Sequence, residues 1–172
     1  MFTLSTKIEL PIAHCLYRGA YSGLCCGNVY RDMSNDGVKE RYDLGDKVFP
    51  IIHAHSYHIT ISLTSNELDR NGMIVDFKKL KKILNGYFDK YYNSTILTPD
   101  NPLCQLYLKN FKENNLDPET QGLFVWDSNP TAEYMSKYWY EAVTKELENN
   151  NIVISKLKLS VEETTHNLVE FE

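Results

Sequence analysis

Two histidines stand two residues apart, at His53 and His55, where an alternating apolar and polar pattern begins. Side chains at positions i and i+2 of a strand project from the same face, about 6 to 7 Å apart at Cα. Two imidazoles in that arrangement can bind one metal ion, at about 2.0 to 2.1 Å per bond for zinc. On spacing alone, a chance pair on a half-buried strand is the better interpretation.

A metal site of this kind needs a third ligand, and the chain has five histidines. His58 lies on the opposite face of the same strand by parity. His14 follows the first predicted strand and would lie beside His53 if the two strands pair, and His166 is the alternative. Three neutral imidazoles would leave a tetrahedral zinc ion one open position for water or substrate, as in catalytic sites.

The strands that would position these histidines follow from hydrophobic periodicity. Residues 2–10 alternate between apolar and polar side chains, and Pro11 is expected to end that strand. A second strand is expected from about 53 to 63. A short buried strand is expected over 123–126 and a last one from 152 to about 161.

Two helices are also predicted. Asp76 can cap the first, since apolar residues recur at helical spacing over 77–88. Ser128 or Asn129 can cap the second, with Pro130 in its first turn, where a missing N–H costs nothing.

Two long stretches, 15–50 and 91–121, are expected to be loops, and long irregular segments in compact domains tend to be functional. The length of 172 residues fits one domain. Helices that are segregated from the strands, rather than alternating with them, favour an α+β fold with an antiparallel sheet.

The composition argues against several function classes. The net charge is −5, and the basic cluster 78–82 is interpreted as the solvated face of a helix, with a phosphate-binding patch as the alternative. Nucleic-acid binding is therefore not expected. We expect no membrane span, since no apolar run reaches about 18 residues. The N-terminus lacks a signal-peptide pattern, and the adjacent Cys25 and Cys26 suit a cytoplasmic protein with reduced thiols.

Five segments, in order along the chain, resemble signatures of the 6-pyruvoyl- and 6-carboxy-tetrahydropterin synthase family. Residues 52–57, Ile-His-Ala-His-Ser-Tyr, resemble its His-Gly-His-Asn-Tyr motif. Residues 72–77, Gly-Met-Ile-Val-Asp-Phe, are similar to its Gly-Met-Val-Met-Asp-Phe stretch, and 129–133, Asn-Pro-Thr-Ala-Glu, to the opening of its second helix. Residues 161–164 resemble the Glu-Thr that ends its last strand, and 11–14 the Ala-Ala-His after its first.

The resemblance implies one tetrahydropterin-synthase-like domain over residues 1–172, with an insertion at about 27–52. It implies the tunnelling fold, expected here as a four-stranded antiparallel sheet with two helices on one face. In that fold, sheets from several subunits close into a β-barrel. Family members are typically homohexamers, dimers of trimers, with active sites at subunit interfaces.

The resemblance also implies a lyase that acts on 7,8-dihydroneopterin triphosphate and forms a 6-carboxy- or 6-pyruvoyl-type tetrahydropterin, for a tetrahydropterin or queuosine-precursor pathway. The implied cofactor is Zn²⁺, and its implied ligands are His14, His53 and His55.

The resemblance further implies that Glu163 grips the pterin ring, with Thr131 and Glu133 as further substrate contacts. A pterin presents an amino group beside a ring N–H, and a carboxylate can accept both hydrogen bonds. From the residues alone, Glu163 is one of several acids expected at the surface. Thr131 and Glu133 also suit the first turn of a helix.

The expected base departs from the family pattern. In the family a cysteine lies a few residues before His-x-His, but residues 44–52 contain no cysteine. Cys26 is the best match and Cys25 the second, although both also suit small buried side chains. Glu40 is the acid that would serve as the base if neither cysteine does.

The family's Asp-His pair, which assists the base, has no match either, since Tyr92 and Asn93 fall at its place. His58 or His166 would then supply any catalytic imidazole, and His166 lies three residues past Glu163. The usual relay is therefore expected to be altered or absent. Two alternatives stay open: an enzyme that cleaves the pterin side chain with a different base, and a non-catalytic zinc- and pterin-binding paralogue.

Overall fold

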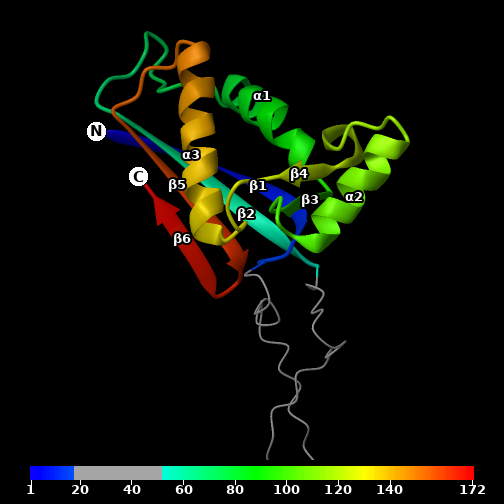
Figure 1. Ribbon diagram of the computed structural model, residues 1–172. Helices are drawn as coiled ribbons and strands as arrows, with labels where there is room; N and C mark the ends of the chain where they lie inside the picture. The colour runs from blue at the N-terminus through cyan, green and yellow to red at the C-terminus, as the bar shows by residue number, and fades with distance from the viewer. Residues whose placement is uncertain (18–51) are drawn as a thin grey trace, which may run out of the picture. The chain divides into compact units, whose positions relative to one another are not determined.

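The computed structural model describes residues 1–17 and 52–172, and it contains a six-stranded sheet in the order β4-β3-β1-β2-β5-β6 (Figure 1). The strands are β1 (Phe2–His14), β2 (His53–Ser65), β3 (Ser94–Leu97), β4 (Leu123–Val125), β5 (Lys156–Thr164) and β6 (Asn167–Phe171). The α-helices are α1 (Phe77–Phe88), α2 (Pro102–Glu113) and α3 (Ala132–Asn149), and two 3-10 helices span Asp89–Tyr91 and Glu119–Gln121.

The described residues fall into two compact units, and β1 and β2 run through both. The first unit contains residues 1–12, 55–94 and 131–172. The second contains residues 13–17, 52–54 and 95–130. No helix in the described part of the chain is long and apolar enough to cross a membrane.

The prediction of a four-stranded antiparallel sheet with two helices is wrong. β3 and β4 pair in parallel, whereas β5 pairs with both β2 and β6 in antiparallel fashion, so the sheet is mixed. β3 and β6 have four and five residues, too few to show a clear period. α2 fully buries only Cys104, so its apolar stripe is weak.

Two predicted strand ends also differ from the structure. β1 continues through Pro11 to His14, and the carbonyl of Pro11 accepts a hydrogen bond from the Asn93 N–H at 3.0 Å. Pro11 thus fits a strand interior despite its missing N–H. β5 begins at Lys156 rather than 152, because Val153 is 87% exposed and belongs to the preceding loop.

In the first unit, α1 and α3 lie side by side over one face of the sheet (Figure 1). The odd-numbered side chains of β2 point to that face, and those of Tyr57, Ile59, Ile61 and Leu63 are fully buried. The antiparallel register places Ile59 opposite Val161 and Ile61 opposite Leu159. The helices add their apolar stripes, which include Leu80, Leu84, Phe88, Met135, Trp139 and Val143.

Helix starts follow their capping side chains. Asp76 caps α1 as predicted, since its Oδ1 accepts the Lys79 N–H at 2.9 Å. The predicted cap of α3 is wrong, because Thr131 rather than Ser128 or Asn129 accepts the Tyr134 N–H, at 3.2 Å.

The second unit has its own small apolar cluster, formed by Cys15, Leu97, Cys104 and Leu123. Asn101 caps α2 by accepting the Leu103 N–H at 2.9 Å, and Pro102 occupies the first helical position. An Asn followed by Pro is a pattern typical of a helix start, although this stretch of the chain, 91–121, was predicted to be a loop. Burial raises the pKa of the Cys104 thiol, and nearby Asp100 adds to that increase.

Trp139 is the central side chain of the first unit's helix layer, fully buried and in edge-to-face contact with Phe88 at 5.7 Å and Tyr91 at 5.9 Å. Trp139→Ala should lower the free energy of unfolding by about 3 to 5 kcal/mol through lost burial and the cavity left behind. Lys137→Ala, exposed on the same helix, should change it by less than about 0.5 kcal/mol. Urea unfolding followed by circular dichroism measures both, and similar losses in the two variants would contradict this packing.

Candidate functional site

Three histidines gather where β1 ends and β2 begins. His14, His53 and His55 each offer one ring nitrogen, and these atoms lie within 4.8 Å of one another. Tetrahedral zinc with bonds near 2.0 to 2.1 Å needs nitrogens about 3.4 Å apart, so small side-chain rotations would suffice. No other group of three histidine, cysteine or acidic side chains comes together in this way among residues 1–17 and 52–172.

His14 is held in one orientation by a neighbouring carbonyl. It is 1% exposed, and its Nδ1 lies 2.8 Å from the oxygen of Pro130. A carbonyl can only accept, so Nδ1 carries the proton and Nε2 carries the lone pair that can bind a metal. A backbone carbonyl that fixes the tautomer is the usual support of a metal-binding histidine. The ring of His53 lies 4.4 Å from that of His14, centroid to centroid.

Asn129 adds a second tie between the same two segments. Its Oδ1 accepts the Tyr17 N–H at 2.7 Å, and its Nδ2 donates to the Tyr17 carbonyl at 3.0 Å. We call these two bonds the Asn129 clamp. Together with the bond from His14 to Pro130, the clamp ties the residues on both sides of Cys15 to Asn129 and Pro130. An Asn before Pro is typical of a helix cap, so the sequence pattern did not indicate this role for Asn129.

Glu163 lies close to His55 on the helix-covered face of the sheet. Its Oε1 is 3.7 Å from His55 Nε2, and the two side chains are 20% and 22% exposed. The buried Tyr57 hydroxyl donates a hydrogen bond to the same Oε1 at 3.0 Å. The register explains the contact, since His58 pairs with Glu162 and Tyr57 is therefore next to Glu163. Glu163 is thus an oriented, half-buried acceptor.

Glu162 points to the opposite face of the sheet. Lys7 donates a hydrogen bond to it at 2.8 Å and, with His58 nearby, holds the pKa of Glu162 below its ordinary value. His58 lies 3.4 Å from Glu162 and 3.9 Å from Glu9. Strand parity therefore placed His58 correctly, away from the histidine cluster.

The structure gives less support for the roles of the other predicted site residues. Thr131 is half-buried and caps α3, while Glu133 is exposed in the first turn of that helix. His166 is exposed in the turn between β5 and β6, where its backbone N–H donates to Thr164 Oγ1 at 3.3 Å. Cys25, Cys26 and Glu40, with the predicted insertion up to residue 51, lie outside the described residues.

Sequence relatives with assigned names match over most of the chain. A 6-carboxy-5,6,7,8-tetrahydropterin synthase from Aquifex aeolicus is 26% identical over 123 residues, which are 70% of this chain and 74% of that protein. A synthase of the same name from Rickettsia felis is 27% identical over 110 residues, 63% of this chain and 75% of that protein.

Solved structures share the fold. An uncharacterised protein from Wolinella succinogenes aligns with a TM-score of 0.66 at 16% identity, over 99% of this chain and 97% of that one. The 6-pyruvoyltetrahydropterin synthase of Plasmodium vivax, solved with alanine in place of a catalytic glutamate, aligns with a TM-score of 0.59 at 12% identity, over 99% and 98%.

The family model described as 6-pyruvoyl tetrahydropterin synthase matches residues 3–172, nearly the whole chain. This match spans every element that carries the histidine cluster, Glu163 and the Asn129 clamp. The chain belongs to the 6-pyruvoyl tetrahydropterin synthase family.

Proposed function

We propose that this protein is a zinc-dependent lyase that acts on 7,8-dihydroneopterin triphosphate and forms a 6-substituted tetrahydropterin. The observation that carries the proposal is the cluster of His14, His53 and His55 with Glu163 beside it, in a chain of this family. The named relatives are 6-carboxy-tetrahydropterin synthases, which favours the 6-carboxy product over the 6-pyruvoyl product.

The donor set supports zinc as the metal. Three neutral imidazoles give a borderline-soft nitrogen site, which suits Zn²⁺ and leaves a fourth position open. His14 is preorganised for this role by the Pro130 carbonyl. When bound, zinc would supply Lewis-acid polarisation of substrate oxygens.

Glu163 is proposed as the group that grips the pterin. Tyr57 donates to one of its oxygens, so the carboxylate plane is fixed before a ligand arrives. Each carboxylate oxygen can accept more than one hydrogen bond, so both still can accept from the amino and ring N–H groups of a pterin. Thr131 and Glu133 remain proposed substrate contacts near the start of α3.

The base is proposed to come from the segment that begins after Tyr17. Cys26 is the first candidate and Cys25 the second, and Glu40 is the candidate if neither cysteine serves. The catalytic glutamate of the Plasmodium vivax relative supports a carboxylate as an alternative base. His166 is proposed as an assisting imidazole. The Asn129 clamp fixes Tyr17, three residues after the proposed metal ligand His14.

A variant enzyme that cleaves the side chain with a different base is the second candidate, and a non-catalytic zinc- and pterin-binding paralogue is the third. The sequence favours both over the usual enzyme at one point: Tyr92 and Asn93 stand at the place of the family's Asp-His pair, so neither an acid nor an imidazole is present there.

We also propose a cytoplasmic homohexamer, a dimer of trimers, in which sheets from several subunits form a β-barrel. The sheet face away from α1 and α3 is polar. Thr3 and Thr64 share a hydrogen bond at 3.1 Å, and Ser5 and Ser62 share one at 2.8 Å. Such a face suits a wet barrel interior, and the edge strand β6 offers backbone groups to a neighbouring strand. Nucleic acid and membranes are not among the proposed partners.

Purified protein should carry about one zinc ion per chain, as inductively coupled plasma mass spectrometry would show. His14→Ala, His53→Ala and His55→Ala should each lose most of it, because a two-imidazole site binds zinc far more weakly. His58→Ala and His166→Ala should keep it. Full zinc content in all three ligand variants would refute the assignment.

Glu163→Gln should weaken pterin binding about 10- to 150-fold, since a charge-assisted hydrogen bond is worth roughly 1.5 to 3 kcal/mol. Glutamine can still accept from Tyr57 through its carbonyl, so the fold should be retained. Glu162→Gln, on the other face, is the matched control and should bind normally. Fluorescence titration with neopterin measures both variants, and equal affinities would contradict a role for Glu163.

The base can be identified by mass-spectrometric product analysis after zinc-loaded protein is incubated with dihydroneopterin triphosphate. Cys26→Ala should lower turnover at least about 100-fold, the scale of a lost general base, and Cys25→Ala should leave it nearly unchanged. If Cys26→Ala stays active and Glu40→Gln does not, the carboxylate is the base. Unchanged substrate with the unmodified protein would favour the binding paralogue.

A further inference from the structure

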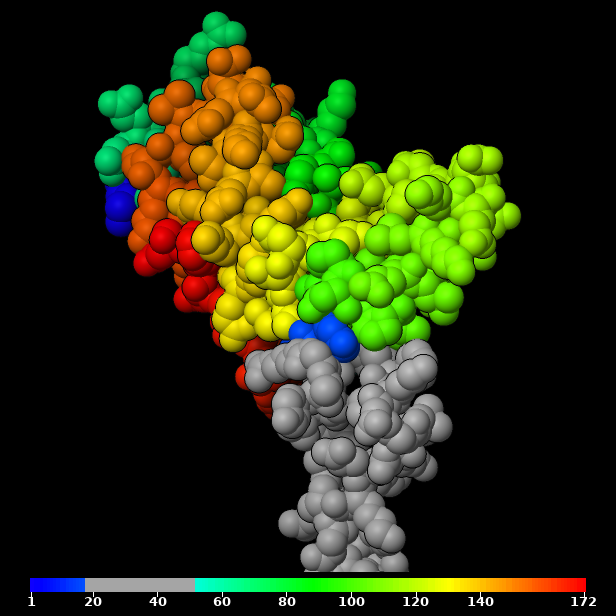
Figure 2. Space-filling view, viewed as in Figure 1, coloured from blue at the N-terminus to red at the C-terminus, as the bar shows by residue number. Residues whose placement is uncertain are grey.

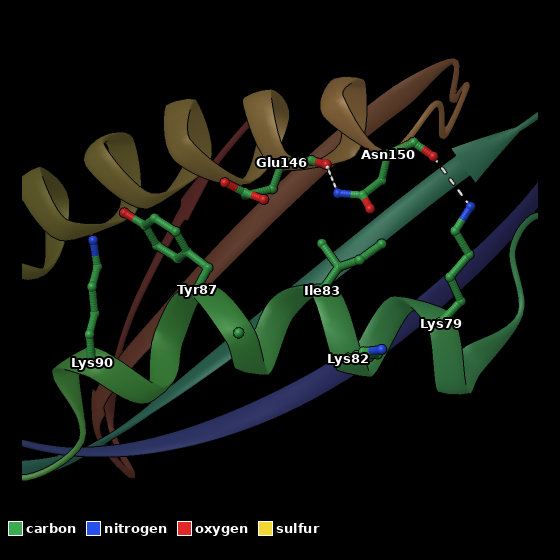
Figure 3. A pocket seen from close by; sticks show the side chains of 8 residues that line it. Lys79, Lys82, Ile83, Tyr87, Lys90, Glu146 and Asn150 are labelled. Atoms are coloured by element: carbon green, nitrogen blue, oxygen red, sulfur yellow. Dashed lines mark hydrogen bonds between the residues drawn. The ribbon is translucent and has the colours of Figure 1, made fainter.

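A groove between α1 and α3 in the first unit is not used by the proposed function. It encloses about 510 Å³, which is within the usual range for small-molecule sites. Figure 3 shows α1 along one wall and α3 along the other. The lining residues are Lys79, Lys82, Ile83, Gly86, Tyr87, Lys90, Glu146 and Asn150.

The groove lies at the far end of α3 from the candidate site. Thr131 caps the N-terminus of α3, whereas Glu146 and Asn150 lie in its last turn and at its C-cap. With a rise of 1.5 Å per residue, they are about 22 to 28 Å from Thr131 along the helix. The outward face of α3 lies at the surface in Figure 2.

Three lysine side chains line this groove, together with one carboxylate. Lys79, Lys82 and Lys90 form no ion pair in the described part of the chain, although Glu146 lines the opposite wall. The chain as a whole is acidic, with a net charge of −5, so an uncompensated group of amines is a local feature. Neighbouring positive charges repel one another, and an anion would relieve that repulsion.

Two of the three amines are positioned by contacts that do not cancel their charge. Lys79 Nζ donates to the carbonyl of Asn150 at 3.3 Å, which leaves two N–H donors on that amine. Lys90 Nζ lies 4.6 Å from the ring centroid of Tyr87 and 4.9 Å from that of Tyr91. These contacts hold the two amines at the two ends of the groove.

Gly86 gives the groove an open floor. It lies inside α1, where glycine costs about 0.5 to 1 kcal/mol relative to alanine. A Cβ at this position would meet no atom within 4 Å, and the backbone has no positive φ. Neither packing nor backbone conformation within the chain therefore requires glycine here. A ligand that approaches the helix closely would require it.

Tyr87 completes the donor set of the groove. Burial raises the pKa of Tyr87 to about 12, so its hydroxyl stays protonated at neutral pH and can donate a hydrogen bond. Its ring and Ile83 form the apolar part of the wall. A ligand that fits this surface has an extended anionic part and a less polar part.

We propose that the groove between α1 and α3 binds the phosphate chain of a nucleoside triphosphate. Lys79 and Lys90 are eleven residues apart, about 16 Å along a helix, which is too long for one phosphate and suits a chain of them with its nucleoside. Lysine amines are effective point charges for phosphate. Glu146, on the opposite wall, suits the hydroxyl and N–H donors of a sugar or base.

Isothermal titration calorimetry of the full chain with ATP and with inorganic tripolyphosphate at low salt tests the proposal. Both probes should bind more tightly than sulfate. Lys82→Gln should weaken binding about 5- to 10-fold, as expected for one lost phosphate contact. The matched control Lys81→Gln removes the same charge from a neighbouring residue outside the groove and should have little effect.

Gly86→Glu tests the open floor without endangering the fold, because glutamate is the better helix former. It should weaken binding by at least about 10-fold, while Asn85→Glu, exposed and outside the lining, should not. His55→Ala should bind both probes normally, which separates this site from the metal centre and from the proposed function.

Two results would overturn the proposal. One is that neither probe binds more tightly than sulfate. The other is that the control variants Lys81→Gln and Asn85→Glu weaken binding as much as Lys82→Gln and Gly86→Glu, which would mean diffuse charge attraction. Tighter binding of ATP than of tripolyphosphate would support recognition of the nucleoside as well. Equal binding would restrict the site to the phosphate chain.

Discussion

Strand β2 alternates its side chains between two faces, and its pairing with β5 fixes which residues share a face. Tyr57, Ile59, Ile61 and Leu63 are all fully buried against the helix layer, so a slip of one residue would expose them all and bury polar side chains instead. His53 and His55 continue the same odd-numbered row toward the start of the strand. The apolar residues of β2 therefore set the direction in which the side chains of the two histidines point.

His14, the proposed third ligand, depends on a different kind of constraint. It is the last residue of β1, and its ring is oriented by the Pro130 carbonyl, while the Asn129 clamp ties Tyr17 to the same turn. These bonds join residues more than 110 positions apart in sequence. The turn before α3 thus supports the ligand on one side and begins the helix on the other.

The histidine cluster and the position of Glu163 beside it could be predicted from the sequence, because they follow strand parity and short motifs. The same parity correctly separated His58 from the cluster, and the structure sets Glu163 apart from Glu162 in the same way. The Asn129 clamp could not be predicted from the sequence, because Asn129 bonds to the backbone of Tyr17. No local sequence pattern identifies a backbone partner. β3, β6 and α2 were missed for a related reason: β3 and β6 are too short to show a period, and α2 shows one buried side chain where a longer stripe is needed.

The polar side chains on the two faces of β2 have different surroundings and therefore different roles. On the helix side, Tyr57 donates to Glu163 and thereby connects the core to the candidate site. On the other side, Ser62 bonds with Ser5, and His58 lies among Glu9 and Glu162. A hydroxyl-rich and charged face cannot join an apolar core without a large desolvation cost. It must stay in contact with water, whether at a surface or in a barrel interior, and so the alternation of β2 keeps these polar side chains apart from the core face that carries Tyr57.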